Sequence, residues 1–403
     1  MVCWGGVVVP RVLAKTLRTL FRKYPVVTVT GPRQAGKTTL CRATFPKLPY
    51  VNLEAADRRE HAASDPRDFL RRYVGGAILD EIQRAPALLS YIQEHVDELG
   101  KPGIFVLTGS RQLDVAQAVT QSLAGRTALL RLLPFSIAEL SRLRPRLDAD
   151  GMIYAGFYPR IHSRKLNPTQ ALADYFETYV ERDLRQISAI RNLSSFERFL
   201  RLCAGRVGQL LNLQALGAEA GVSHTTAREW ISVLEASYVL FLLQPYHANI
   251  SKRLIKSPKL FFYDVGLATY LLGIEDVRQV ATHPLRGALF ENLVVAEALK
   301  HRYNRGLRSN LYFFRESTGH EVDLLCQLAD RLVAVEIKSG TTVVSDWFAN
   351  LARIRETLPR QVRHAILVHA GKADEDRHGV RVTNVRGFTA ALAECDTQAH
   401  AGS

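Results

Sequence analysis

The sequence predicts an α/β protein in three parts: an N-terminal parallel sheet, a helical middle region and a C-terminal α/β part. Three observations support this prediction. The β-branched run Val26–Thr30 leads into a glycine-rich loop and then a helix. Apolar residues over 168–204 are spaced for helices, and strand-like runs return after His283-Pro284. With 403 residues, we expect domains at 1–160, 161–283 and 284–403.

The composition is that of a globular protein with a strong positive charge. The formal net charge is +14, from 53 Lys and Arg against 39 Asp and Glu. This excess favours a polyanionic partner, and simple solubility is the alternative explanation. No apolar stretch approaches the ~18 residues of a membrane span, and the N-terminus lacks the pattern of a signal peptide, so we expect a cytoplasmic protein. No C-x-x-C pair links the five cysteines, which we expect to be reduced: Cys3, Cys41, Cys203, Cys326 and Cys395.

The glycine-rich loop has the pattern G-x-x-x-x-G-K-T of a phosphate-binding loop. In this pattern the glycines let backbone N–H groups surround phosphates, Lys37 reaches the β- and γ-phosphate oxygens, and Thr38 offers its hydroxyl to Mg²⁺. The N-terminus of the helix predicted over 37–43 points at the same anion. The predicted nucleotide-binding residues are Gly31, Pro32, Arg33, Gln34, Ala35, Gly36, Lys37, Thr38 and Thr39.

Two further strands are expected to end in polar groups beside this loop. The run 77–79 ends in Asp80-Glu81, in which Asp80 would hold Mg²⁺ and Glu81 would orient and deprotonate the attacking water. The run 104–107 ends near Thr108 and Ser110. Ligands bind at the carboxyl ends of such strands, so either hydroxyl is a candidate sensor of the γ-phosphate or the catalytic water, with a polar turn as the alternative.

Arginine near a γ-phosphate stabilises the charge that develops during phosphoryl transfer, whether it comes from the same chain or from a neighbouring subunit. Arg126, which precedes the strand-like run 127–133, is our candidate.

Several runs together resemble one branch of the AAA-type ATPases, in which the ATPase domain precedes a C-terminal region of unknown function. They are Leu79-Asp80-Glu81-Ile82-Gln83, Leu107-Thr108-Gly109-Ser110, Gly125-Arg126 and the N-terminal Arg11-Val12-Leu13. The resemblance implies that the protein binds ATP with Mg²⁺ and forms a homo-oligomer. The run Tyr179-Val180-Glu181-Arg182-Asp183-Leu184 resembles a signature of the same family. There Arg182 or Asp183 either contacts nucleotide or a neighbouring subunit, or forms an ordinary surface pair.

The segment 213–234 predicts a helix, a tight turn at Gly221 and a second helix capped by Ser223. With the strands expected over 238–243 and 259–263, this order indicates a winged-helix-like region. Such regions bind DNA or proteins. Glu229 and Glu235 on the second helix argue against its whole face contacting phosphates. The residues expected to meet DNA are His224, Thr225, Thr226 and Arg228 on the helix, with Lys252, Arg253 and Lys256 in the wing.

The C-terminal part places a helix with Glu291 before strands that carry Asp323 and then Glu336-Ile337-Lys338. This order resembles the core of PD-(D/E)xK nucleases, a restriction-endonuclease-like fold. The resemblance implies that Glu291, Asp323 and Glu336 hold Mg²⁺, and that Lys338 polarises the attacking water or offsets phosphate charge. Because side chains alternate along a strand, Glu336 and Lys338 share one face. Domains of this fold also occur as DNA-binding or interaction modules without cleavage.

These observations lead to a primary hypothesis, an ATPase that remodels or processes DNA. One alternative is a regulatory ATPase switch whose C-terminal half binds proteins and whose nuclease-like fold is inert. Another is a metal-dependent nuclease in which ATP only controls access.

Overall fold

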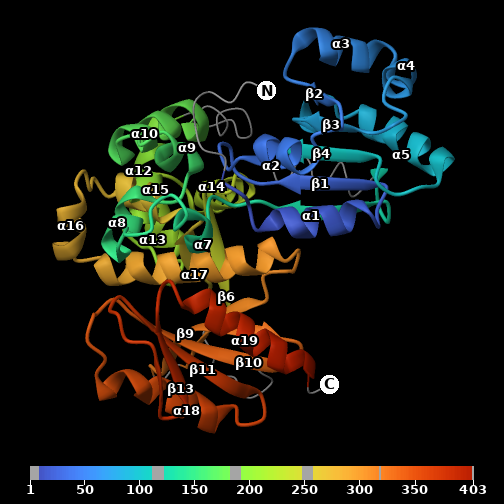
Figure 1. Ribbon diagram of the computed structural model, residues 1–403. Helices are drawn as coiled ribbons and strands as arrows, with labels where there is room; N and C mark the ends of the chain where they lie inside the picture. The colour runs from blue at the N-terminus through green and yellow to red at the C-terminus, as the bar shows by residue number, and fades with distance from the viewer. Residues whose placement is uncertain (1–8, 111–121, 182–191, 247–256, 317–318, 402–403) are drawn as a thin grey trace.

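The computed structural model describes residues 9–110, 122–181, 192–246, 257–316 and 319–401 (Figure 1). The N-terminal part contains α1 (Leu13–Phe21), β1 (Val26–Thr30), α2 (Lys37–Thr44), β2 (Tyr50–Asn52), α3 (Ala56–Ser64), α4 (Pro66–Arg71), β3 (Ala77–Asp80), the 3₁₀ helix η1 (Ile82–Arg84), α5 (Leu88–Leu99), β4 (Phe105–Gly109) and β5 (Thr127–Arg131).

The N-terminal strands form a parallel sheet in the order β2-β3-β4-β1-β5. All five residues of the interior strand β1 are buried, as its β-branched sequence favours. The register pairs Thr30 with Gly109, so β1 and β4 end at the same edge. The predicted parallel sheet is therefore confirmed, and its carboxyl edge gathers the loops that follow β1, β3 and β4.

The middle region contains α7 (Ile137–Leu140), α8 (Ala149–Ala155), α9 (Pro159–Ser163), α10 (Pro168–Tyr175), the π-helix η2 (Phe176–Glu181), α12 (Leu193–Ala204), α13 (Leu213–Ala220), α14 (His224–Ala236), β6 (Leu240–Pro245), β7 (Lys259–Phe262), α15 (Val265–Leu271) and α16 (Val277–Thr282). The predicted turn lies at Gly221, whose φ of 75° ends α13. Ser223 caps α14 by accepting a hydrogen bond from the Thr226 N–H. Strands β6 and β7 then pair antiparallel.

The C-terminal part contains α17 (Arg286–Asn304), β8 (Leu311–Arg315), β9 (Glu321–Leu328), β10 (Arg331–Lys338), the 3₁₀ helix η3 (Ser345–Phe348), α18 (Ala349–Thr357), β11 (Val362–His369), β12 (Glu375–Arg377), β13 (Val380–Asn384) and α19 (Phe388–Ala401). Strands β8, β9 and β10 form an antiparallel meander, and β11 joins β10 in parallel after α18.

One eight-stranded sheet, in the order β12-β13-β11-β10-β9-β8-β6-β7, crosses the boundary that we placed at residue 283/284. Strand β6 pairs antiparallel with β7 and in parallel with β8, through Gln244 and Tyr312. One hydrophobic core extends from Val9 to Cys395. The middle and C-terminal parts therefore share both a sheet and a core.

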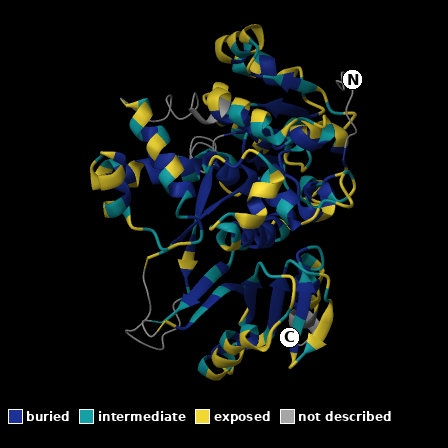
Figure 2. Cartoon of the chain, turned by 90° about the vertical axis from the view of Figure 1, so that its left-hand side faces the viewer, coloured by how far each residue is buried: buried dark blue, intermediate teal, exposed yellow. Residues whose placement is uncertain are grey.

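Helix α17 lies between the middle region and the C-terminal strands (Figure 1). Of its 19 residues, 14 are buried, because elements pack against it from several sides. The strands of both sheets are also largely buried (Figure 2).

Within the described residues, no helix is both long and apolar enough to cross a membrane. The described cysteines, Cys41, Cys203, Cys326 and Cys395, are buried and free, in agreement with the predicted reduced state.

Candidate functional site

The loop between β1 and α2 has the backbone geometry that a phosphate-binding loop needs. A side chain at Gly31, where φ is 151°, would place its Cβ 2.0 Å from the Leu132 carbonyl oxygen. Gly36 caps α2 in the left-handed region, with φ of 90°. Gln34 adopts φ of 60°, which is unusual for a residue with a side chain and often marks a functional site. Only glycine fits at Gly31, so the loop can curl against the segment that follows β5.

The side chain of Lys37 is folded back onto its own loop. Its ammonium donates hydrogen bonds to the carbonyl oxygens of Gly31 and Pro32, both at 2.9 Å. Burial lowers the pKa of Lys37, against the opposing effect of Glu81 and Asp80. A triphosphate in the loop would supply the negative charge that this buried cation lacks.

Asp80, at the end of β3, is the centre of a hydrogen-bond cluster. It accepts hydrogen bonds from the hydroxyls of Thr38 (2.9 Å) and Tyr50 (2.7 Å), and from Thr108. The hydroxyl of Thr38 and the carboxylate of Asp80 thus converge, as they must to hold Mg²⁺ beside phosphate oxygens. Bound there, the cation would offset phosphate charge. Tyr50, from β2, was not predicted from the sequence because no motif marks it.

Glu81 lies beside Asp80 with φ of 59°, a strained conformation for a residue with a side chain. Its carboxylate accepts hydrogen bonds from Ser110 (3.1 Å) and from Gln83, and the Gln83 amide also donates to Ser110 at 3.2 Å. Its backbone N–H donates to the Thr108 hydroxyl at 3.3 Å. The structure therefore brings Glu81, Thr108 and Ser110 together. Gln83 joins them, a residue within the run Leu79 to Gln83 whose role the sequence did not show.

Arg126 lies at the opposite edge of the sheet. Its carbonyl accepts a hydrogen bond from the N–H of Val26, the first residue of β1, whereas the phosphate loop follows the last. Five strand residues span roughly 15 Å. Its guanidinium instead forms a bidentate ion pair with Asp97, at 2.6 and 2.7 Å. Arg126 is thus too far away to contact a nucleotide bound to its own chain. This corrects the prediction that it acts within the same chain. A role at a neighbouring subunit is untouched by this geometry.

Arg11 supports the phosphate loop from behind. Its guanidinium donates to the Ala35 carbonyl at 2.6 Å and to the Leu133 carbonyl at 2.7 Å, and pairs with Glu139 at 3.0 Å. Both side chains of this pair are almost fully buried. The sequence indicated Arg11 only as part of a resemblance, since its partners lie far along the chain.

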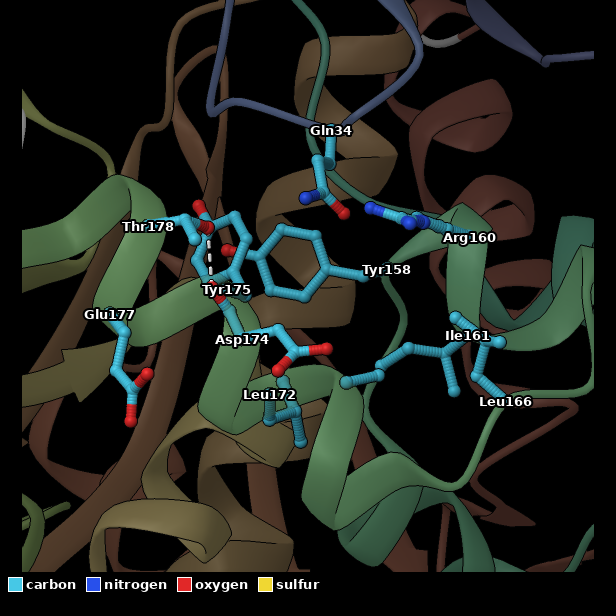
Figure 3. A pocket seen from close by; sticks show the side chains of 11 residues that line it. Gln34, Tyr158, Arg160, Ile161, Leu166, Leu172, Asp174, Tyr175, Glu177 and Thr178 are labelled. Carbon is cyan, nitrogen blue, oxygen red and sulfur yellow. Dashed lines mark hydrogen bonds between the residues drawn. The ribbon is translucent and has the colours of Figure 1, made fainter.

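A cavity of about 450 Å³ opens beside the phosphate loop. Gln34 lines it from the loop, and α9, α10 and η2 contribute residues that include Arg160, Asp174 and Glu177. Figure 3 shows the side chains of Gln34 and Arg160 extending toward one another at one side of the cavity. Such a volume is typical of small-ligand sites, and a ligand here would contact both the loop and the helical region.

The exposed start of α14 carries the predicted DNA-facing residues. His224, Thr225 and Arg228 are exposed and Thr226 is half-buried. Lys252, Arg253 and Lys256 lie outside the described residues, as do Arg182 and Asp183.

The C-terminal acidic residues do converge, but together with two lysines. Lys338 contacts Glu336 Oε1 at 2.6 Å, and the N–H of Ile337 donates to Asp323 at 2.8 Å. Lys259, from β7, contacts Glu291 at 2.9 Å and Glu321 at 2.5 Å. Burial, together with the nearby charge of Asp323, raises the pKa of Glu336 to about 7, and burial raises that of Glu291 to about 8 despite the opposing Lys259.

No group of three or more His, Cys, Asp or Glu side chains in the described parts of the chain has the geometry to hold a metal ion. The predicted set of Glu291, Asp323 and Glu336 therefore stays a prediction. In this structure the Lys259 ammonium is bonded to Glu291 and holds that carboxylate as an ion pair. Lys259 was expected to belong to a wing and not to this cluster.

Comparison with known proteins assigns the chain. Residues 23–141 match the AAA domain, and residues 146–278 and 286–388 match two domains of unknown function, DUF8612 and DUF4143. The uncharacterized proteins Mb2031c of Mycobacterium bovis and Rv2008c of Mycobacterium tuberculosis are each 33% identical over 333 residues, which is 82% of this chain and 74% of the relative. The chain belongs to the same family as these two proteins. With its AAA domain and its phosphate loop, this family member is a P-loop ATPase of the AAA type.

Two solved structures show distant similarity to this ATPase. The Walker-type ATPase PABY2304 of Pyrococcus abyssi has a TM-score of 0.43 at 16% identity, covering 64% of this chain and 94% of that one. The Hsp104–ADP complex of S. cerevisiae has a TM-score of 0.26 at 12% identity, covering 74% and 44%.

Proposed function

We propose that this ATPase uses ATP hydrolysis to change its grip on DNA held at the exposed start of α14. The observation that carries the proposal is a contact between the strand that leads into the phosphate loop and the residues that follow α14. Helix α14 ends at Ala236, and Tyr238, two residues later, has φ of 57°. Its hydroxyl is 2.8 Å from the hydroxyl of Thr30, the residue before Gly31. Any movement of the phosphate loop on hydrolysis therefore acts directly on the end of α14.

The chemistry at the nucleotide follows from the residues at the sheet edge. Lys37 would leave the loop carbonyls to contact the phosphates, with Thr38 and Asp80 holding Mg²⁺. Glu81, oriented by Ser110 and Gln83, would accept a proton from the attacking water. Thr108 contacts both Asp80 and the backbone of Glu81, so it would register a change at either residue.

Three features support DNA as the partner. The chain has a net charge of +14. The order of three helices followed by an antiparallel pair, from α12 to β7, resembles that of a winged helix and supports this part of the proposal. The N-terminus of α14, with its exposed His224, Thr225 and Arg228, is the part of such a module that enters a groove.

The test is ATP turnover with and without single-stranded, duplex and branched DNA, at several salt concentrations, with cleavage of the DNA followed in the same tubes. We expect salt-dependent binding and faster ATP turnover with at least one DNA form. Arg228→Ala should reduce the slope of the logarithm of the DNA-binding constant against the logarithm of salt concentration by about one, as expected for one lost phosphate contact. Arg278→Ala, which removes an equal charge from the distant helix α16, is the matched control. If no DNA form binds and none stimulates ATP turnover, the DNA proposal is ruled out.

A second candidate is a regulatory ATPase switch whose C-terminal half binds proteins. One observation favours it. Glu291 of α17, one of the residues that resemble the PD-(D/E)xK set, already forms an ion pair with Lys259. Mg²⁺-dependent cleavage of any DNA form would exclude an inert C-terminal site, whereas ATP turnover without a DNA effect would support the switch.

A further inference from the structure

A strongly basic surface lies on α1, in the ATPase part of the molecule. The sequence contains no Asp or Glu before Glu54. The opposite side of α1, with Leu13 and Leu17, is buried against the strands of the ATPase sheet. Four exposed cationic side chains lie on α1 and the two residues after it, and we call them the α1 basic face: Lys15, Arg18, Arg22 and Lys23.

The charge of the α1 basic face is not balanced by acids of the same chain. Among the residues that the structure describes, none of the four cations forms an ion pair. Other exposed arginines differ in this respect, since they pair as follows: Arg67 with Glu94, Arg72 with Asp68 and Arg278 with Asp276. The unbalanced cations of α1 are therefore available to an external anion.

The segment at the end of α17 extends this surface. The Thr16 hydroxyl donates to the Asn304 carbonyl at 2.8 Å, so the end of α17 lies against α1 (Figure 1). Residues 298–315 contain no Asp or Glu. Arg305 of this segment pairs with Asp396, whereas Arg308 is exposed and forms no ion pair within the described ranges. Two segments far apart in the sequence thus contribute cations to one side of the molecule.

The spacing on α1 suits the phosphate backbone of a nucleic acid. Lys15, Arg18 and Arg22 follow an i, i+3, i+7 pattern, which places them in one row roughly 10 Å long. Each strand of a DNA duplex carries one charge about every 3.4 Å along the axis, so about three phosphates fall within such a row.

Two other classes of partner fit this surface less well. A membrane-bound helix inserts its apolar face, but the apolar face of α1 is buried in the protein core. Protein interfaces depend on apolar or aromatic residues at their centre. The exposed residues within α1 are Lys15, Arg18 and Thr19, and none of them is apolar.

We propose that the α1 basic face is a second nucleic-acid surface, which holds the phosphates of one strand and contacts no bases, with Arg308 at its margin. Because phosphate contacts carry no sequence information, binding here should not depend on base sequence. The inference rests on the proposed function for its class of partner and not for its location, since α1 and α14 belong to different parts of the molecule.

The test measures how salt affects the binding of two short DNA duplexes of unrelated sequence to the full chain. Lys15→Gln/Arg18→Gln/Arg22→Gln should reduce the slope of the logarithm of the binding constant against the logarithm of salt concentration by about three, equally for both duplexes. Binding should also weaken by about tenfold or more. Arg308→Gln alone should reduce the slope by about one, and it covers the case in which the triple variant does not fold.

The matched control is Arg67→Gln/Arg72→Gln/Arg278→Gln, which removes the same charge from arginines that are already paired. Its slope should equal that of the wild type, and thermal unfolding shows whether each variant is folded. Equal slopes in the wild type and the folded triple variant of α1 would overturn the proposal, as would a wild type that binds neither duplex. Binding to phosphatidylserine vesicles that this variant loses, with DNA binding unchanged, would assign the surface to a membrane instead.

Arg228→Ala separates this inference from the proposed function. Weaker DNA binding in the α1 variant but not in Arg228→Ala would support the α1 basic face and count against α14. The reverse result would support α14 and overturn the inference about α1.

Discussion

At the residue scale, the nucleotide site depends on side chains that are held before any nucleotide binds. Glu81 is fixed by a strained backbone and by two side-chain donors, Ser110 and Gln83. Such fixing reduces the reorganisation needed at the moment of reaction. The carboxylate of Glu81 is thus held in place beside Asp80.

The role of Glu81 leads to a clear prediction. Glu81→Gln should retain ATP but slow hydrolysis by roughly 10²–10⁴-fold, because an amide cannot accept the proton from water. Lys37→Ala is the comparison: it should lose ATP binding as well as turnover. Binding of a fluorescent ATP analogue and single-turnover hydrolysis measure the two effects separately. Unchanged hydrolysis in Glu81→Gln would remove this residue as the base.

Glu297 of α17 predicts a pH dependence of stability. Burial raises the pKa of this carboxyl from 4.5 to about 7, against the opposing charge of Lys300, whose ammonium lies 3.8 Å from Oε2. Between these pH values the folded state binds more protons than the unfolded chain, so its stability falls as pH rises from about 4.5 to 7. The full effect is roughly 3 kcal/mol.

Glu297→Gln should remove this loss. The amide oxygen can still accept the hydrogen bond from the Ile137 N–H, which the wild type makes at 2.9 Å. Urea unfolding at pH 5 and pH 8 should therefore show a smaller stability difference in the variant than in the wild type. An identical difference in both proteins would show that Glu297 is not the titrating group.

At the scale of elements, the segment over 132–140 joins the phosphate loop to α17. Its first residue, Leu132, lies against Gly31, and the Leu133 carbonyl accepts from Arg11. Further on, Glu139 pairs with Arg11, and the N–H of Ile137 donates to Glu297. This short segment therefore contacts the nucleotide site on one side and the central helix on the other.

Breaking the Arg11–Glu139 pair should reveal the support of the loop. Arg11→Ala should raise the KM for ATP more than it lowers kcat, because the Ala35 carbonyl loses its donor while Glu81 stays in place. It should also cost about 3 kcal/mol of stability, since Glu139 becomes a buried, unpaired charge. In Arg11→Ala/Glu139→Gln the stability should recover in part, because the amide keeps one of the two acceptors that Glu139 offers to the N–H groups of Val12 and Ser136, and the high KM should remain. Recovery of both would reduce Arg11 to a purely structural role.

At the scale of the whole molecule, the ATPase sheet and the second sheet are joined by contacts between distant residues. Thr30 contacts Tyr238, and Arg131 donates to the hydroxyl of Tyr303 on α17 at 2.9 Å. Tyr238, just after α14, therefore lies against β1, which leads into the phosphate loop, and the end of α17 lies against β5, the neighbour of β1. Coupling between nucleotide and the C-terminal half would pass through them.

Tyr238→Phe tests this coupling, since it removes one hydroxyl and preserves the packing. We expect ATP turnover without DNA to stay within about twofold of the wild type, while the stimulation by DNA falls. The loss of one hydrogen bond should cost only about 1 kcal/mol of stability. Full stimulation by DNA in Tyr238→Phe would exclude this contact as the route.

The sequence by itself determined what is local in the chain. The phosphate loop, the Asp80-Glu81 pair and the Ser223 cap each depend on neighbours within a few residues, where spacing dictates geometry. Strand order and direction are not local. For that reason the sequence could not show that Gly125-Arg126 lies at the edge of the sheet opposite the phosphate loop. Nor could it show that α17 is buried on most sides.

Only the tertiary structure decided the composition of the C-terminal cluster. The order of Glu291, Asp323, Glu336 and Lys338 predicted their convergence, because strand alternation and chain order are readable. Lys259 could not be predicted there, because it arrives from a strand that the sequence assigns to another region. Its burial between two carboxylates depends on β6 pairing with both β7 and β8, a long-range contact that no local pattern encodes.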